Sequence, residues 1–432
     1  MSVAENAGNI ASAKQNVRFC ICNFVIPAKA GIQSFLAFLD SRLRGNDKKK
    51  PDILFCARHS YATVSFDDYM ERLHCSAKKK GVPVEAMIEL TYGCNLNCLH
   101  CYNPTHLARN ETDTSQILSI LSQLAKLGTC LVTFTGGEIF SRKDIFEILD
   151  HTRQKGMQFI LLTNATLITE VTADRLKQLD PYRVCVSLYG ATAETYEKVT
   201  RVRGSFKKFV RGLDLLLRQK FPVELRSIIL NTNLHEFEAL RRFTEKLRLR
   251  FDYASEINPR LDGSREPLQH RISPEEDLKL WCAFHGNNFL KKMARVSSPC
   301  KSTTQGPFNC RCGKSSLVIT PYGKMNLCLF NTFPQENILE SSVAAGWKSL
   351  VNLVQKSKPT KDYVCTSCSV FDYCARGPSD SFSEMGDVNT CVPYQKEKAV
   401  LKKKYVEGVS KNPDCHPEHI RFAQCKLREG SA

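Results

Sequence analysis

The sequence lacks the features of membrane-spanning and secreted proteins. No apolar stretch reaches the roughly 18 residues that a membrane span requires. An apolar run at residues 19–39 is broken by Pro27 and Lys29. No basic region with a cleavage site stands before it, so it is not a secretory signal. We therefore expect a cytoplasmic protein with no membrane partner.

Cysteine, by contrast, is abundant, with 20 in 432 residues. The cysteines gather at residues 94–101 and 300–391 instead of being spread as in a secreted disulfide framework. Clusters of this kind, without a secretory signal, predict a reducing compartment and thiolates that bind metal.

The charge balance is strongly basic. Lys and Arg number 61 against 44 Asp and Glu, a formal net charge of +17. Such an excess can indicate nucleic acid or an acidic partner. The cations are spread over expected helix faces, with short runs at residues 48–50, 78–80 and 402–404. We expect solvated helix surfaces and no nucleic-acid partner, with an acidic ligand or redox partner as the alternative.

The first 57 residues show neither helical nor strand periodicity. Residues 25–47 resemble the translation of a bacterial intergenic repeat, and a natural disordered leader is the alternative. We predict that residues 1–57 are a disordered or spurious extension in which Cys20, Cys22 and Cys56 bind nothing, with a native start near Met70.

From Val84 onward, short apolar strands alternate with amphipathic helices. The predicted strands are residues 85–91, 130–135, 158–163, 183–188, 223–230 and 251–258. The helix at 114–127 places five apolar residues on one face, namely Ile117, Ile120, Leu121, Leu124 and Leu127. Six such units predict an α/β fold over residues 58–258, with a parallel sheet closed or partly closed into a TIM-like (βα)6 barrel.

Active sites of such barrels lie at the carboxyl ends of the strands. Polar motifs follow the predicted strands there: Cys94, Cys98 and Cys101 with Tyr102, then Gly136, Gly137 and Glu138, then Asn164, Ser187 and Asn231–Asn233. The C-x3-C-x2-C spacing supplies three thiolates, which leaves one iron of a 4Fe-4S cluster open, whereas structural zinc takes four ligands. Zinc with a fourth ligand from His100 or His106 is the alternative, and it leaves the Gly-Gly-Glu motif unexplained.

On these residues, the stretch 84–258 resembles the radical S-adenosylmethionine (radical SAM) superfamily. The resemblance implies that the three cysteines bind a 4Fe-4S cluster and that S-adenosylmethionine chelates its open iron. It assigns the contacts to S-adenosylmethionine to Tyr102, Gly136, Gly137, Glu138, Asn164 and Ser187. It further implies reductive cleavage to a 5'-deoxyadenosyl radical that takes hydrogen from a substrate, with electrons from a low-potential flavodoxin or ferredoxin.

A second group of cysteines surrounds a predicted β-hairpin at residues 317–329. Its members are Cys312, Cys328, then Cys365, Cys368 and Cys374 in C-x2-C-x5-C spacing, and Cys391. This pattern resembles the SPASM extension, a small cysteine-rich α+β domain whose seven cysteines bind two auxiliary clusters. The resemblance implies a domain at 300–394, after a linker and helices at 259–299 and before a basic helix and tail at 395–432.

One cysteine of the SPASM pattern is absent, because Gly377 and Pro378 occupy the places where it is expected. The last four cysteines still complete one auxiliary 4Fe-4S cluster. At the cluster of Cys312 and Cys328, either Cys300 or Cys310 supplies further thiolates, one iron stays open, or the cluster is lost. One or two auxiliary clusters are thus expected, and a zinc ribbon is the alternative.

Enzymes of this arrangement mostly modify peptides or proteins, and we expect a peptide or protein substrate, as in the maturation of ribosomally made peptides. No leader-recognition domain is apparent before Val84. The alternatives are a small-molecule oxidoreductase of the haem-precursor type, a sulfatase maturase and, more distantly, a non-catalytic electron carrier. No catalytic residue is identified; Tyr189, Glu256 and Cys282 are candidates by position only.

Overall fold

The computed structural model describes residues 66–285, 307–308, 311–330, 332–361, 363–374 and 377–411. The expectations for residues 1–57, Cys300 and Cys310 lie outside these ranges. Six parallel strands stand next to one another in chain order: β1 (Glu85–Thr91), β2 (Leu131–Gly136), β3 (Gln158–Thr163), β4 (Arg183–Ser187), β5 (Val223–Ile228) and β6 (Arg250–Ala254). The predicted parallel α/β fold is confirmed.

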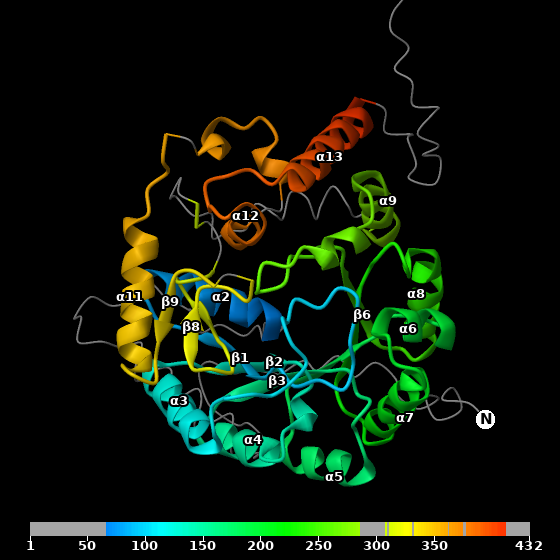
Figure 1. Ribbon diagram of the computed structural model, residues 1–432, viewed down its shortest axis with the longest axis vertical. Coiled ribbons are helices and arrows are strands. Elements are labelled where there is room, and N and C mark those ends of the chain that lie inside the picture. Colours follow the sequence, from blue (N-terminus) through cyan, green and yellow to red (C-terminus); the bar gives the residue numbers. More distant parts are fainter. Residues whose placement is uncertain are drawn as a thin grey trace, which may run out of the picture.

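Helices cover the outer face of these strands and form an arc around them (Figure 1). They are α3 (Thr114–Leu127), α4 (Ile145–Gln154), α5 (Glu170–Leu179), α6 (Ala193–Thr200), α7 (Ser205–Arg218) and α8 (Phe237–Lys246). α2 (Phe66–Lys80) precedes β1, and α9 (Pro274–His285) follows β6. Within the described residues β6 pairs only with β5, so the barrel is partial and stays open at this edge.

Helix α3 shows how local sequence sets the boundaries of an element. The Asp113 side chain accepts a hydrogen bond from the Gln116 backbone, and the Gln116 side chain accepts one from the Asp113 backbone. This capping box satisfies N–H groups that a helix start leaves without partners. At the other end Gly128 has φ +98°, which only glycine adopts at little cost.

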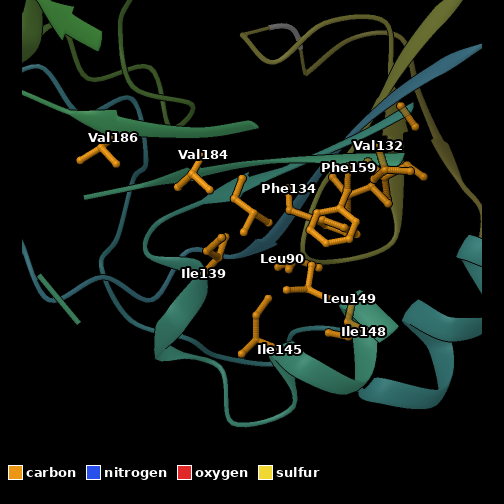
Figure 2. Packing of buried hydrophobic residues seen from close by; sticks show 14 of the residues in the cluster. Leu90, Val132, Phe134, Ile139, Ile145, Ile148, Leu149, Phe159, Val184 and Val186 are labelled. Carbon is orange, nitrogen blue, oxygen red and sulfur yellow. The ribbon is translucent and has the colours of Figure 1, made fainter. Parts of the chain in front are cut away.

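The core lies between the strands and the outer helices. Leu90, Phe134 and Phe159 from three adjacent strands meet Ile148 and Leu149 of α4 (Figure 2). The rings of Phe134 and Phe159 are 6.1 Å apart. Burial of one such side chain stabilises the fold by about 1.5–3 kcal/mol, so this layer holds the strand ends at fixed positions.

The hairpin of the second cysteine region extends the barrel sheet. β7 (Ser316–Ile319) pairs in parallel with β1, and β8 (Lys324–Asn326) and β9 (Gln335–Asn337) follow in antiparallel pairing. One nine-stranded sheet therefore runs from β6 to β9. The division of the chain at residue 300 stays a prediction, but the hairpin and the barrel share this sheet.

Helices and short 3₁₀ turns complete the described chain. The helices are α11 (Val343–Lys356), α12 (Pro378–Met385) and α13 (Pro393–Lys411). The 3₁₀ turns are η2 (Ile139–Ser141), η3 (Leu234–Glu236), η4 (Glu266–His270), η6 (Val364–Ser367) and η7 (Phe371–Tyr373). None of the helices in the described ranges is long and apolar enough to cross a membrane.

Candidate active site

A cavity of about 380 Å³ lies at the carboxyl ends of the barrel strands. Its wall includes residues in or just after the carboxyl-terminal part of each of the six strands, together with Leu329 and Phe330 from the segment after β8. Among the predicted site residues, those that line it are Cys94, Cys98, Cys101, Tyr102, Gly136, Gly137, Asn164 and Ser187. The structure thus brings together motifs that are spread over almost a hundred residues of sequence.

The loop after β1 holds the three cysteines half-buried at this cavity. Backbone bonds fix the loop from several sides: the Cys94 N–H donates to the His106 carbonyl at 3.1 Å, and the Leu99 N–H donates to the Val199 carbonyl at 3.0 Å. The Cys101 N–H donates to the Cys98 carbonyl at 3.1 Å. The loop is therefore held in place by the protein itself.

Crowding and burial make these thiols hard to deprotonate. Burial raises the pKa of Cys94 to about 12. Burial, with the neighbouring Cys101 and Cys94, raises the pKa of Cys98 well above its usual value. A metal centre reverses this effect, because a bound cation deprotonates coordinating thiols.

The two glycines of the Gly-Gly-Glu motif let β2 approach the cysteine loop. A Cβ on Gly136 would lie 2.2 Å from the Thr91 carbonyl oxygen, and one on Gly137 would lie 2.2 Å from the Gly93 carbonyl oxygen. The Gly137 N–H donates to the Thr91 carbonyl at 2.6 Å. Gly136 has φ +131°, in the region that favours glycine. Larger residues at these positions would push the loop away from the sheet.

Glu138 is fully buried, and its side chain is not among those that line the cavity. Its carboxylate accepts hydrogen bonds from the Thr163 hydroxyl at 2.8 Å, the Asn164 N–H at 2.7 Å and the Phe140 N–H at 3.1 Å. Burial raises its pKa, and these bonds partly oppose that effect. In this structure Glu138 joins the ends of β2 and β3.

Asn164 connects the cysteine loop to the end of β3. Its side-chain amide donates to the Asn95 Oδ1 at 3.1 Å, and its Oδ1 accepts from the Thr166 N–H at 2.9 Å. The amide nitrogen lies 4.0 Å from the Cys94 Sγ. Asn164 is 7% exposed and lines the cavity, and these hydrogen bonds leave its side chain little freedom to move.

Tyr102 is fixed by a carboxylate that the sequence did not reveal. Its hydroxyl donates to the Glu89 Oε1 at 2.7 Å, and its ring meets Phe330 edge-on at 5.2 Å. Glu89 is 1% exposed, and burial raises its pKa to about 8 despite hydrogen bonds from Tyr102 and Tyr92. The sequence feature that could have predicted this contact is a Glu inside an apolar strand, because carboxylates are rarely buried without partners.

The wall on the β5 and β6 side carries charges. Arg226, Asp252 and Glu256 line the cavity there. Lys398 of α13, which is 2% exposed, places its Nζ 3.0 Å from the Glu256 Oε1 and 3.0 Å from the Asp277 Oδ2. The C-terminal helix therefore supports a cavity wall, which the expectation of a solvated lysine-rich helix surface missed.

Of the three residues named as catalytic candidates by position, two line the cavity and one does not. Tyr189 and Glu256 line the cavity, and the Tyr189 ring meets His100 at 4.8 Å. Cys282 is 2% exposed on α9 and does not line it.

The donors at the cavity fit an iron–sulfur cluster better than a single metal ion. Across the residues that the structure describes, no three Cys, His, Asp or Glu side chains converge closely enough to hold one ion. This result disfavours zinc with His100 or His106. It does not conflict with a cluster, because each thiolate then binds a different iron and the sulfurs stay apart.

A second cavity of about 300 Å³ lies between the η6 and η7 turns and α13. Four of its lining residues are the cysteines predicted to form one complete ligand set, namely Cys365, Cys368, Cys374 and Cys391. Cys391 lies far along the chain from the other three, beyond α12. Cys312 and Cys328 lie elsewhere, where Cys312 and Ser379 hydrogen-bond to Cys328 and lower its pKa to about 6 although burial opposes the shift.

Comparison with known proteins agrees with this geometry. Residues 88–244 match the family model described as the radical SAM superfamily. The chain is 24% identical over 332 residues to an AdoMet-dependent heme synthase of Methanosarcina barkeri, covering 71% of this chain and 94% of that protein. It is 28% identical to the mycofactocin maturase MftC of Mycolicibacterium smegmatis, covering 68% of this chain and 78% of that protein. A PqqA peptide cyclase of Bradyrhizobium diazoefficiens is 28% identical over 39% of this chain and 44% of its own length.

Among solved structures, Streptococcus suis SuiB bound to S-adenosylmethionine superposes with a TM-score of 0.58, at 17% identity, over 77% of this chain and 82% of that chain. A partial parallel barrel with three cysteines at its mouth defines the class as an iron–sulfur barrel enzyme. The family match then makes the assignment specific for the barrel: residues 88–244 match the radical SAM superfamily. Members of this superfamily use a 4Fe-4S cluster and S-adenosylmethionine, and the matched residues include the three cysteines of the cavity.

Proposed function

We propose that Cys94, Cys98 and Cys101 hold the 4Fe-4S cluster and that S-adenosylmethionine binds beside it in the same cavity. The observation that carries this assignment is that the three cysteines share one cavity with residues from the ends of β2, β3 and β4. When bound, the pair supplies a radical that removes a hydrogen atom from the substrate.

The residues of the chain orient these groups. Gly136 and Gly137 let the backbone approach S-adenosylmethionine closely. Glu138 positions the residues at the end of β3 beside S-adenosylmethionine, because its carboxylate accepts hydrogen bonds from Thr163 and Asn164. Tyr102 and Ser187 supply the remaining contacts.

A peptide or protein is the substrate class that the cavity wall favours. Arg226, Asp252 and Glu256 place both signs of charge there, next to Asn258. Such a wall can pair with N–H and C=O groups and with charged side chains. The name of one relative, PqqA peptide cyclase, points in the same direction.

A haem precursor is the second candidate, because the heme synthase match extends over 94% of that protein. Tetrapyrroles carry several carboxylates, which favour sites with several cations. The described lining of the cavity has Arg226 as its single Arg or Lys, beside the carboxylates of Asp252 and Glu256. The charges therefore favour the peptide.

In the second cavity, Cys365, Cys368, Cys374 and Cys391 are the proposed ligands of an auxiliary 4Fe-4S cluster. Four thiolates complete such a site. Cys312 and Cys328 are proposed as ligands of a further auxiliary cluster, for which Cys300 or Cys310 would supply the additional thiolates. A low-potential flavodoxin or ferredoxin is the proposed electron source, and a cytoplasmic location without nucleic-acid or membrane partners is proposed with it.

Formation of 5'-deoxyadenosine by the anaerobically reconstituted enzyme with dithionite and S-adenosylmethionine tests the assignment. Cys98→Ala should abolish the product, since two thiolates do not hold the cluster. The matched control is Cys282→Ala, which removes a buried thiol outside the cavity. Full product formation by Cys98→Ala, or none by the wild type with a reconstituted cluster, would contradict the proposal.

The substrate class is tested by two parallel incubations. One contains any small precursor peptide that the neighbouring genes are found to encode, and the other contains Fe-coproporphyrin. Mass loss of the peptide by two hydrogens for each new bond, coupled to 5'-deoxyadenosine, is the expected result. Coupled oxidation of the porphyrin alone would favour the haem-precursor reading.

A further inference from the structure

Two exposed apolar side chains stand beside the four-cysteine cavity. Val364 is 52% exposed and Phe371 is 43% exposed, and both line that cavity at its rim. Seven large hydrophobic residues are exposed to this extent among the described residues, and two of them are these. Single exposed apolar residues are common on protein surfaces and need no explanation. Two of them at the rim of one cysteine cavity form a small apolar patch that does.

The 3₁₀ turns explain why these two face outward. The Cys368 N–H bonds the Cys365 carbonyl at 3.4 Å, and the Phe371 N–H bonds the Cys368 carbonyl at 3.1 Å. These successive tight turns bury Cys365 and Val370, which are 8% and 5% exposed. The side chains next to them in sequence, Val364 and Phe371, are left at the surface.

Helix α13 supplies cations to the same rim. Lys396 and Val400 line the cavity, and Lys404 continues their face at i+4 spacing. Lys396 and Lys404 are exposed. Lys403 donates to the Ser369 carbonyl at 3.2 Å, which holds the helix against the turns.

The neighbouring acids limit the local charge. Asp372 and Glu397 are also exposed, each next in sequence to a member of the rim. The local excess of lysine is therefore small, although the whole chain carries +17. We expect charge to steer the approach of a partner and the apolar pair to hold it, as in interfaces with an apolar centre and a polar rim.

We propose that Val364, Phe371, Lys396 and Lys404 form the docking surface for an acidic one-electron carrier protein of the flavodoxin class. The proposal rests on the proposed iron–sulfur function of the four cysteines beneath this surface. In the transfer, the reduced flavin of the carrier loses one electron and the centre held by the cysteines gains it. No bond is made or broken. A small, weak interface is typical of such redox encounters.

The test uses reconstituted full-length enzyme and a purified acidic flavodoxin. One double variant, Val364→Ser with Phe371→Ser, removes the apolar pair, and a second, Lys396→Glu with Lys404→Glu, reverses the charges. The matched controls are Val171→Ser on α5, where the side chain is 69% exposed, and the exposed Lys208→Glu on α7. Helices α5 and α7, which carry these controls, lie at the opposite end of the molecule from α13 (Figure 1).

Two quantities are measured. The first is the affinity for flavodoxin at low and high NaCl. The second is a rate ratio, the rate of cluster reduction by reduced flavodoxin divided by the rate of reduction by dithionite. Dithionite is small and needs no docking surface, so the ratio corrects for any change in cluster loading. Each double variant should lower affinity and ratio about tenfold, the effect of roughly 1.4 kcal/mol, and both controls should match the wild type. The charge variant should also lose its salt dependence.

Wild-type affinity and ratio in both double variants would overturn the proposal. An equal loss in Lys208→Glu would overturn it as well, since net charge would then explain the result. Failure of the proposed function looks different: dithionite-treated wild type would form no 5'-deoxyadenosine, whatever its affinity for flavodoxin.

Discussion

Replacement of Lys398 by Met removes one buried cation while keeping an unbranched apolar side chain. The Lys398 Nζ lies 3.0 Å from both the Glu256 Oε1 and the Asp277 Oδ2, and Lys398 is 2% exposed. Ser255 also donates to Asp277. Loss of the cation therefore leaves two carboxylates near each other at the interface of α13, α9 and the cavity wall.

The cost follows from what remains around the carboxylates. Removal of one partner from a buried ion pair costs about 3–5 kcal/mol. Glu256 is 39% exposed and can regain water, while Asp277 is 5% exposed and keeps Lys402 at 4.0 Å. We therefore expect Lys398→Met to lower the free energy of unfolding by about 2–4 kcal/mol, below the full range because of these two compensations.

The loss should depend on pH. Burial opposes the charge on Lys398, but Glu256 and Asp277 raise its pKa above the usual value. Burial would raise the pKa of Glu256, but Lys398 holds it below the usual value. The stabilisation by Lys398 is lost as pH rises through its raised pKa, and that by Glu256 is lost as pH falls through its lowered pKa. The difference in free energy of unfolding between wild type and Lys398→Met should be largest from about pH 5 to 10 and should shrink below about pH 4.

Urea unfolding followed by the fluorescence of Trp281 and Trp347 measures this difference. The matched control is Arg218→Met, which breaks an i,i+4 pair with Asp214 in which Arg218 is 58% exposed. We expect it to cost less than about 0.5 kcal/mol. A loss below about 1 kcal/mol for Lys398→Met, or a loss that does not change between neutral and acidic pH, would refute the reasoning.

Three further outcomes are expected. Iron analysis of Gly137→Ala should show a loss of about four irons per chain, because the added Cβ would lie 2.2 Å from a carbonyl oxygen of the cysteine loop. The control Gly156→Ala, whose Cβ would have no atom within 4 Å, should keep its iron. Glu138→Gln should lower the free energy of unfolding by about 1–3 kcal/mol, measured by urea unfolding, because an NH₂ group would face backbone donors; an unchanged value would contradict the role given to this carboxylate. Cys365→Ser should lower iron by about four per chain, while Cys282→Ser should not, and zinc in place of these four irons in the wild type would contradict the auxiliary cluster proposed at the four-cysteine cavity.

The sequence predicted the barrel elements well where local signals were strong. The predicted ranges 85–91, 158–163 and 114–127 coincide with β1, β3 and α3. The last strand was predicted at 251–258 but spans Arg250–Ala254. β6 stands at the open edge and pairs only with β5 in the described chain, so fewer ladder bonds extend it.

The surroundings of ionisable side chains were less predictable. That Glu138 meets S-adenosylmethionine stays a prediction, and the hydrogen bonds that its carboxylate accepts from Thr163, Asn164 and Phe140 were not foreseen from the sequence. Lysines of the C-terminal helix were expected in solvent, and that expectation was wrong for Lys398 and Lys402, which are 2% and 12% exposed. Their partners lie on α9 and after β6, far away in sequence.

The sequence by itself determined the order of strands and helices, the two cysteine groups and the resemblance to the radical SAM family, because periodicity, caps and ligand spacing are local properties of the chain. Only the tertiary structure decided that the predicted hairpin continues the barrel sheet through β7 and β1, that α13 supports the cavity wall, and that Val364 and Phe371 border the second cysteine cavity. The physical reason is distance: hydrogen bonds, ion pairs and shared cavities depend on which atoms come within a few ångströms, and residues far apart in sequence carry no local sign of that contact.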